Sequence, residues 1–256
     1  MALRAALYGL LAGSTLVVGA LIGLYVKIGR RIIAIVMAFG AGVLISTLAF
    51  ELVEKAYSTG GFDSTTIGFV AGALLFILGD WAVNHQGGHF RKDTLNKRYL
   101  AREPESGEGS GMAIFIGALL DGIPESAAIG IALLTGQGVG LIVVLAVFLS
   151  NIPEGISGAV SMDRAGRSKS SILSMWGAVA VVSSLSSLFG HLVLSHSGVD
   201  VIAFFLSLAA GAILAMVSST MIPEAFDDEG RLTPIATPLA ATVGFLLSSI
   251  LSALKK

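Results

Sequence analysis

Eight apolar segments, each close to the length that a helix needs to cross a lipid bilayer, divide this chain. A spanning helix takes about 20 predominantly apolar residues. The segments lie at about 5–26, 32–56, 66–84, 111–134, 138–162, 170–193, 199–224 and 236–254. Only 13% of the residues are charged, against about 25% in an average soluble domain. The sequence therefore predicts an all-α, polytopic membrane protein in which residues 1–256 form a single transmembrane domain.

Basic residues divide unequally between the two sides of this predicted bundle. Of the 16 Lys and Arg residues, all but Arg4, Lys55, Lys255 and Lys256 fall in the gaps after the first, third, fifth and seventh segments. Because cytoplasmic loops carry the excess of positive charge, these gaps are expected to face the cytoplasm and both termini to lie outside. The long gap at about 85–110 is then a cytoplasmic loop. Its two histidines, His85 and His89, could bind metal loosely, but exposure to solvent in a loop is the favoured interpretation. The expected location is the plasma membrane.

Composition also excludes several classes of function. The formal net charge is −1 and no basic run is sustained, which argues against nucleic acid as a partner. The chain has no cysteine, so it forms neither disulfides nor thiolate metal sites.

Acidic residues inside the apolar segments carry the functional signal, because a carboxylate within the bilayer is costly unless it faces partners or water. The tripeptide Ile-Pro-Glu occurs at residues 123–125, 152–154 and 222–224, and uses half of the six prolines. A proline within a helix leaves the carbonyl four residues earlier without its usual donor, and in lipid that carbonyl needs another partner. A freed carbonyl beside a carboxylate is suited to binding a cation.

The first two tripeptides belong to related motifs that read as two halves of one site. Asp121 lies four residues before Glu125, and Ser150 lies four residues before Glu154, so each pair shares a helix face. If the two segments face each other, they offer only oxygen donors, which suit divalent cations. The predicted metal ligands are Asp121, Glu125, Ser150, Asn151 and Glu154.

Three further glutamates lie close to the ends of their apolar segments or on a polar helix face. Glu51 shares a helix face with Thr47 and is expected to line an entrance or exit path. Glu54 and Glu224 are expected near the outer and inner membrane surfaces. Because burial disfavours a charged carboxylate, metal entry would release protons, and proton-linked transport is a hypothesis that follows.

The paired motifs resemble those of the ZIP family of divalent metal transporters, whose fourth helix carries His-Asn-x-Pro-Glu-Gly and whose fifth carries a related motif. Residues 121–126 and 150–155 occupy those places, and the resemblance extends over the whole chain. It implies eight spans in a 3+2+3 inverted-repeat arrangement and transport of divalent metal, zinc above all, into the cytoplasm. It also implies that Glu125 and Glu154 bridge or jointly bind the ion.

This chain departs from the family pattern at four positions. Asp121 replaces the usual His and Gly122 the usual Asn in the first motif. Ser150 stands where His or Gln is common, and Asn151 where an acid is common. One metal position is therefore expected rather than two. The harder donor set keeps manganese, iron(II) and cadmium as candidates beside zinc.

Two other functions are alternatives to metal transport. A carrier of a non-metal solute would use the buried carboxylates for proton coupling or to bind an organic cation. An intramembrane metal hydrolase would need an open metal position and a general base, but the chain has no His-Glu-x-x-His motif and no His in segments four and five. The protein is thus expected not to be an enzyme and to hold no tightly bound cofactor. Its expected partners are the transported ion, the bilayer and a second copy in a homodimer.

Overall fold

The computed structural model describes residues 1–83, 108–226 and 233–254, and all secondary structure in these ranges is helical. The α-helices are α1 (Ala2–Tyr25), α2 (Arg30–Thr47), α3 (Glu54–Val83), α6 (Glu108–Thr135), α7 (Gln137–Arg164), α8 (Lys169–Leu194), α9 (Val199–Met216), α10 (Ile222–Phe226) and α11 (Thr233–Ala253). Two π-helical segments, η1 (Leu48–Val53) and η3 (Val217–Met221), follow α2 and α9. The prediction of an all-α protein is confirmed.

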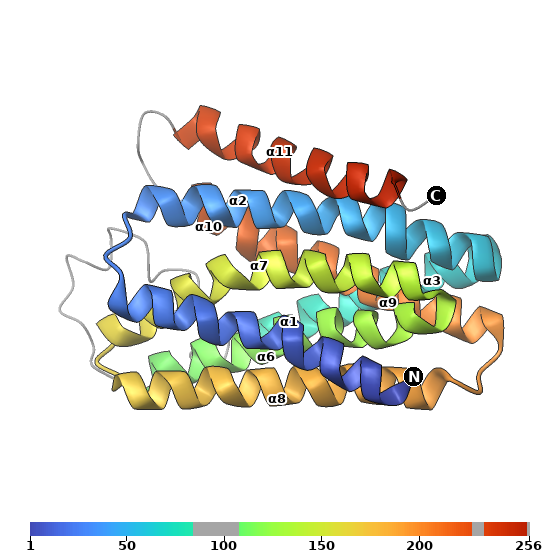
Figure 1. The fold of residues 1–256 in the computed structure, drawn as a ribbon, viewed down its shortest axis with the longest axis horizontal. Helices are drawn as coiled ribbons and strands as arrows, with labels where there is room; N and C mark the ends of the chain where they lie inside the picture. The colour runs from blue at the N-terminus through green and yellow to red at the C-terminus, as the bar shows by residue number, and fades with distance from the viewer. Residues whose placement is uncertain (84–107, 227–232, 255–256) are drawn as a thin grey trace.

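Seven helical stretches in the described ranges are long and apolar enough to cross a membrane, as in polytopic membrane proteins. One of them, Arg30–Val83, has 54 residues. A straight helix of that length would extend about 80 Å, more than twice the thickness of the bilayer core. The stretch is broken at Gly61, whose φ of 73° and ψ of −169° lie outside the helical region and favour glycine. Beyond Gly61 the rest of α3 runs back along the bundle, opposite to α2 (Figure 1).

Several expected boundaries shift. The second and third segments were expected to end at 56 and restart at 66, but the chain is helical on both sides of Gly61. The fourth was expected to start at 111, whereas α6 begins at Glu108. Most of the predicted loop at 85–110, with His85 and His89, lies outside the described residues.

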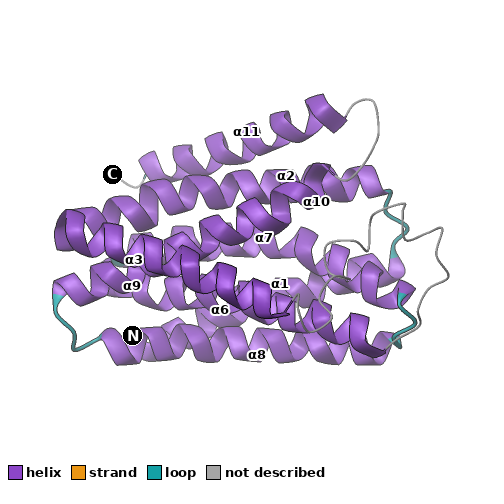
Figure 2. Ribbon diagram, turned by 180° about the vertical axis from the view of Figure 1, so that it is seen from behind, coloured by secondary structure: helices purple, strands orange, loops and turns teal. Residues whose placement is uncertain are grey.

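The long helices pack as two interlocking groups. In the first group, α1 packs against α7 and α8, and α6 packs against the same two helices. In the second group, α2 packs against α11, and α3 packs against α9. The two groups meet where α2 contacts α7 and α9 contacts α6. Figures 1 and 2 show the helices lying roughly side by side along the long axis, with the N-terminus and the end of α11 at the same end of the bundle.

Glycines bring the paired backbones of the second group unusually close, as small residues do between membrane helices. A Cβ atom placed on any of four glycines would lie 1.9–2.2 Å from a carbonyl oxygen of the neighbouring helix. The pairs are Gly42 with Ala241 and Gly244 with Phe39 between α2 and α11, and Gly211 with Phe69 and Gly72 with Leu208 between α9 and α3. In each pair of helices, the carbonyl that a glycine approaches belongs to the residue three positions before the glycine of the other helix. The two helix pairs therefore use the same reciprocal contact.

Candidate functional site

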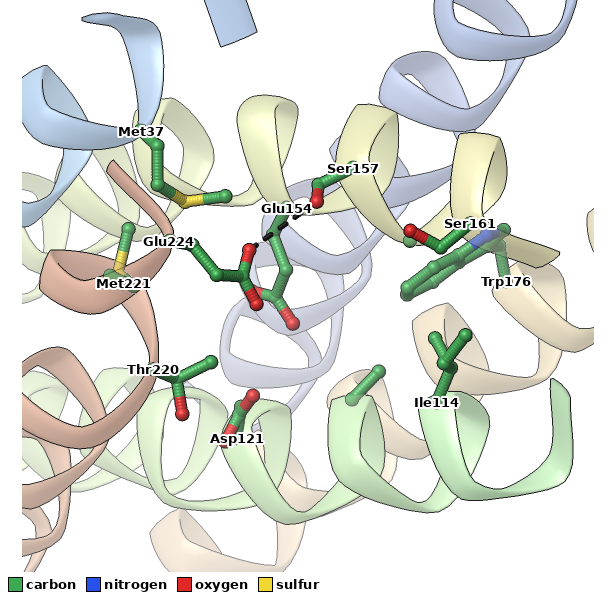
Figure 3. Close-up of a pocket in the computed structure, with 12 residues that line it drawn as sticks. Met37, Ile114, Asp121, Glu154, Ser157, Ser161, Trp176, Thr220, Met221 and Glu224 are labelled. Carbon is green, nitrogen blue, oxygen red and sulfur yellow. Dashed lines mark hydrogen bonds between the residues drawn. The ribbon is translucent and has the colours of Figure 1, made fainter. Parts of the chain in front are cut away.

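A cavity of ≈ 40 Å³ lies between the two groups of helices, at the junction of α2, α6, α7, α8 and the η3–α10 segment (Figure 3). A single water needs a space of about 10–15 Å³, so the cavity admits an ion with a few waters. Its polar lining consists of Asp121, Glu154, Glu224, Ser157, Ser161 and Thr220, and its apolar lining includes Met37, Met221, Ile114, Ala118 and Trp176.

Three carboxylates from three different helices face this cavity. Asp121 comes from α6, Glu154 from α7 and Glu224 from α10. Figure 3 shows Glu154 and Glu224 pointing toward each other, with Asp121 facing them from the opposite side. Ser157 Oγ donates a hydrogen bond to Glu224 Oε2 at 3.3 Å. None of the described residues that line the cavity is basic, so its electrostatic potential favours a cation.

The cavity extends along one face of α7. Glu154, Ser157 and Ser161 follow one another at spacings of three and four residues, so they share that face. From Glu154 the face leads toward the C-terminal end of α7 at Arg164. This end of the bundle carries most of the basic residues in the described ranges: Lys27, Arg30, Arg31, Arg164, Arg167 and Lys169.

Glu125 lies outside the cavity, although it is the glutamate of the first Ile-Pro-Glu motif. Its side chain is 1% exposed, and both carboxylate oxygens lack a hydrogen-bond partner among the described residues. Asp121 lies four residues earlier on α6, so the two carboxylates are on the same side of that helix. A buried charge without a partner is very unfavourable. Glu125 therefore needs either a proton or a nearby cation.

Ser150 and Asn151 also lie away from the cavity lining, and their hydrogen bonds serve helix structure. Ser150 Oγ donates to the Val147 carbonyl of its own helix at 3.1 Å. Asn151 Nδ2 donates to the Ala12 carbonyl of α1 at 3.0 Å. The amide thus ties α7 to α1, beside the point where the two backbones approach at Gly155 and Leu16.

Glu51 is buried in η1, outside the cavity. The neighbouring Thr47 Oγ1 donates to the Val43 carbonyl and is 3.1 Å from Ser248 Oγ of α11. The pathway role of Glu51 stays a prediction.

The five predicted ligands are therefore separated in this structure. Asp121 and Glu154 line one cavity, whereas Glu125, Ser150 and Asn151 are not among its lining residues. Within the described ranges, no three His, Cys, Asp or Glu side chains are close enough together to hold one metal ion. A bound dication would have to draw the three cavity carboxylates together.

Sequence reasoning missed part of the cavity lining. Glu224 belongs to the third Ile-Pro-Glu motif, but it was placed near a membrane surface rather than with Glu154. Ser157 and Ser161 follow Glu154 at helical spacing, and that periodicity was a usable signal. Thr220 had no signal of its own.

Comparisons with known proteins assign no family. No protein-family model matches the sequence, and no curated protein is significantly similar to it.

Proposed function

We propose that this chain is a polytopic membrane transporter of the ZIP family that carries a divalent metal ion into the cytoplasm, with zinc as the first candidate. The observation that carries the proposal is the placement of Asp121, Glu154 and Glu224, from three separate helices, on one small cavity. Glu125, one helical turn beyond Asp121, is the proposed next ligand along the path.

The charge of the cavity favours a dication. Three carboxylates that line one small cavity repel one another in a medium of low dielectric constant. A doubly charged cation offsets that repulsion better than a single proton or a monovalent ion. Carboxylate and hydroxyl oxygens are also ligands that divalent cations accept.

Eight crossings are proposed rather than seven. Gly61 turns the stretch Arg30–Val83 back on itself, so it supplies two crossings. The remaining six long helices then alternate in direction along the bundle (Figure 1). We place the basic end of the bundle in the cytoplasm, because positive charge concentrates on that side of the plasma membrane. The cavity lining on α7 then extends from Glu154 toward the cytoplasmic side.

An inverted repeat is also proposed. In this repeat, the equivalent helices are α1 and α8, α2 and α9, α3 and α11, and α6 and α7. The contact between α2 and α11 is then equivalent to the contact between α9 and α3. The contact between α1 and α7 is likewise equivalent to the contact between α8 and α6. All four pairs are observed as contacts. Both α2 and α9 have 18 residues and run into a π-helical segment. Such repeats commonly surround a binding site near the middle of the membrane.

Cavity size separates this proposal from a carrier of an organic solute. Pockets for small organic ligands measure about 300–1,000 Å³. The cavity here measures ≈ 40 Å³. That volume supports an ion as the cargo.

The test is uptake of radioactive zinc by proteoliposomes that contain the wild type, Asp121→Asn or Glu154→Gln. Both variants keep side-chain size and lose one charge. Asp200→Asn is the matched control, because Asp200 is an exposed acid at the start of α9. Saturable uptake is expected in the wild type and the control and is expected to be lost in both cavity variants. No metal-dependent flux in folded wild type, or full uptake in both variants, would overturn the proposal.

A further inference from the structure

Two methionines line the cavity beside its carboxylates. Met37 comes from α2 and Met221 from η3, so two separate elements bring a thioether to the same wall. Figure 3 shows both side chains next to Glu224, with the end of Met37 directed toward Glu154. Among the described residues that line the cavity, thioether sulfur is thus the only metal-binding atom softer than oxygen, because the indole N–H of Trp176 has no free lone pair.

Both thioethers are shielded from everything except the cavity. Met37 is 2% exposed and Met221 is 3% exposed. The Met221 methyl carbon lies 3.3 Å from the position of a Cβ on Gly40, which is three residues after Met37 on α2. Gly40 therefore provides the space in which the end of Met221 sits. An ion in the cavity would meet these side chains without displacing lipid or solvent-exposed groups.

The opposite half of the molecule supplies an internal comparison. Taking Gly42 and Gly211 as equivalent, Met37 corresponds to Leu206, since each lies five residues before its glycine. Met221 corresponds to Leu52, since each lies ten residues after its glycine. All four side chains are buried in the same apolar cluster. Of the four, only the two methionines also line the cavity, whereas the two leucines do not.

We propose that Met37 and Met221 determine the metal selectivity of the cavity by offering thioether sulfur to the ion beside the carboxylates, so that zinc, cadmium and iron(II) are favoured over magnesium and calcium. This inference rests on the proposed transport function. Oxygen ligands alone suit magnesium, calcium and manganese, whereas thioether sulfur prefers softer ions. The pair restores part of the softness that the chain loses by having neither His nor Cys at the site.

The test is competition for zinc uptake in proteoliposomes. The variants are Met37→Leu, Met221→Leu and the double variant, which keep the apolar volume and remove sulfur. Met216→Leu is the matched control, because Met216 is equally buried but does not line the cavity. The expected result is a loss of about tenfold or more in the preference for cadmium over magnesium in the double variant, with the control unchanged.

A binding measurement keeps the inference testable if the double variant is poorly folded. Cadmium-113 NMR of the wild-type protein in detergent distinguishes sulfur-containing from all-oxygen coordination, and a sulfur-shifted signal that moves in Met37→Leu is expected. An all-oxygen signal, or an unchanged cadmium-to-magnesium ratio in active variants, would overturn the role of the methionines and leave the transport proposal standing. Wild-type protein without any metal uptake would instead overturn the transport proposal itself.

Discussion

Glu125 and Glu154 occupy the same position in the same tripeptide, yet only one of them reaches a cavity. After Glu154, the face of α7 continues through Ser157, Gly158 and Ser161, which all line the cavity. The matching positions after Glu125 are Ala128, Ile129 and Ala132, and all three are 0% exposed. The Ile-Pro-Glu motif itself therefore does not determine whether its glutamate lines the cavity. The residues one and two helical turns after the motif determine this.

Helix direction turns this local difference into a difference between the two ends of the bundle. α6 and α7 run in opposite directions, so the face after Glu154 leads to the basic end and the face after Glu125 leads to the end that holds both termini (Figure 1). On α7, the small residues Ser157, Gly158 and Ser161 leave space for the cavity. The matching positions of α6 are filled by Ala128, Ile129 and Ala132, which are buried in the same apolar cluster as the valines of α7. Among the described residues, the cavity lining therefore extends along α7 toward the basic end, whereas the matching positions of α6 are packed.

The largest effect is expected from replacing Gly158 of α7 by isoleucine, the residue at the matching position 129 of α6. In Gly158→Ile, the new side chain would collide with Trp176, because even a Cβ atom there lies 2.5 Å from Cζ2 of the indole. Zinc uptake is expected to fall to the level of protein-free vesicles. Uptake of radioactive zinc by protein that elutes as a single species measures this.

The reciprocal variant Ile129→Gly is the control for that experiment. It removes packing from α6 and leaves the cavity lining unchanged, so uptake is expected to persist despite a lower melting temperature. Normal uptake by folded Gly158→Ile would contradict the comparison.

The second largest effect is expected in the solvent accessibility of matching positions on α7 and α6. The chain has no cysteine, so single cysteine variants report one position each. Ser161→Cys is expected to react with a charged thiol reagent in detergent more than about tenfold faster than Ala132→Cys, because only the first side chain reaches a cavity that admits water. The measurement is the labelling rate by mass spectrometry. Equal rates would mean that both positions are accessible.

A smaller effect is expected on stability. Glu125 buries two carboxylate oxygens without hydrogen-bond partners, and an unsatisfied buried polar group costs about 1–3 kcal/mol. Glu125→Leu should therefore raise the free energy of unfolding by about that amount in metal-free protein. Thermal unfolding in detergent with a chelator measures it.

Glu154→Leu provides the contrast, since Glu154 is only half-buried and should gain less. A loss of stability in Glu125→Leu would indicate that the carboxyl group already has a stabilising partner.

The smallest effect concerns the link between α7 and α1. Asn151→Ala removes the hydrogen bond to the Ala12 carbonyl and should lower stability by about 1 kcal/mol. Ser150→Ala should leave stability nearly unchanged, because its hydroxyl bonds only within its own helix. Melting temperatures of the two variants, compared under the same detergent conditions, give the difference. Equal losses would show that the two side chains contribute alike.

The helical fold class and the residue types near the site could be predicted from the amino-acid sequence. Runs of apolar residues have to satisfy their backbone groups internally in lipid, so helices were the necessary outcome. Asp121 and Glu154 could be selected because carboxylates within such runs are too costly to keep without a purpose. The internal correspondence of Gly42 with Gly211 was also present in the sequence, but the surrounding residues are too different for it to stand out.

Which carboxylates lie together depends on how the helices pack, and this could not be predicted from the sequence. Glu224 joins Glu154 because η3 brings the end of the α9 segment against α7, a contact between residues far apart in the chain. Glu125 was excluded because its neighbours Ala128 and Ile129 pack against other helices, and a linear pattern does not specify those partners. Met37 and Met221 carried no sequence signal, since buried methionine is ordinary in a helix. Burial and cavities depend on how separate helices fit together, and that fit is a property of the assembled bundle.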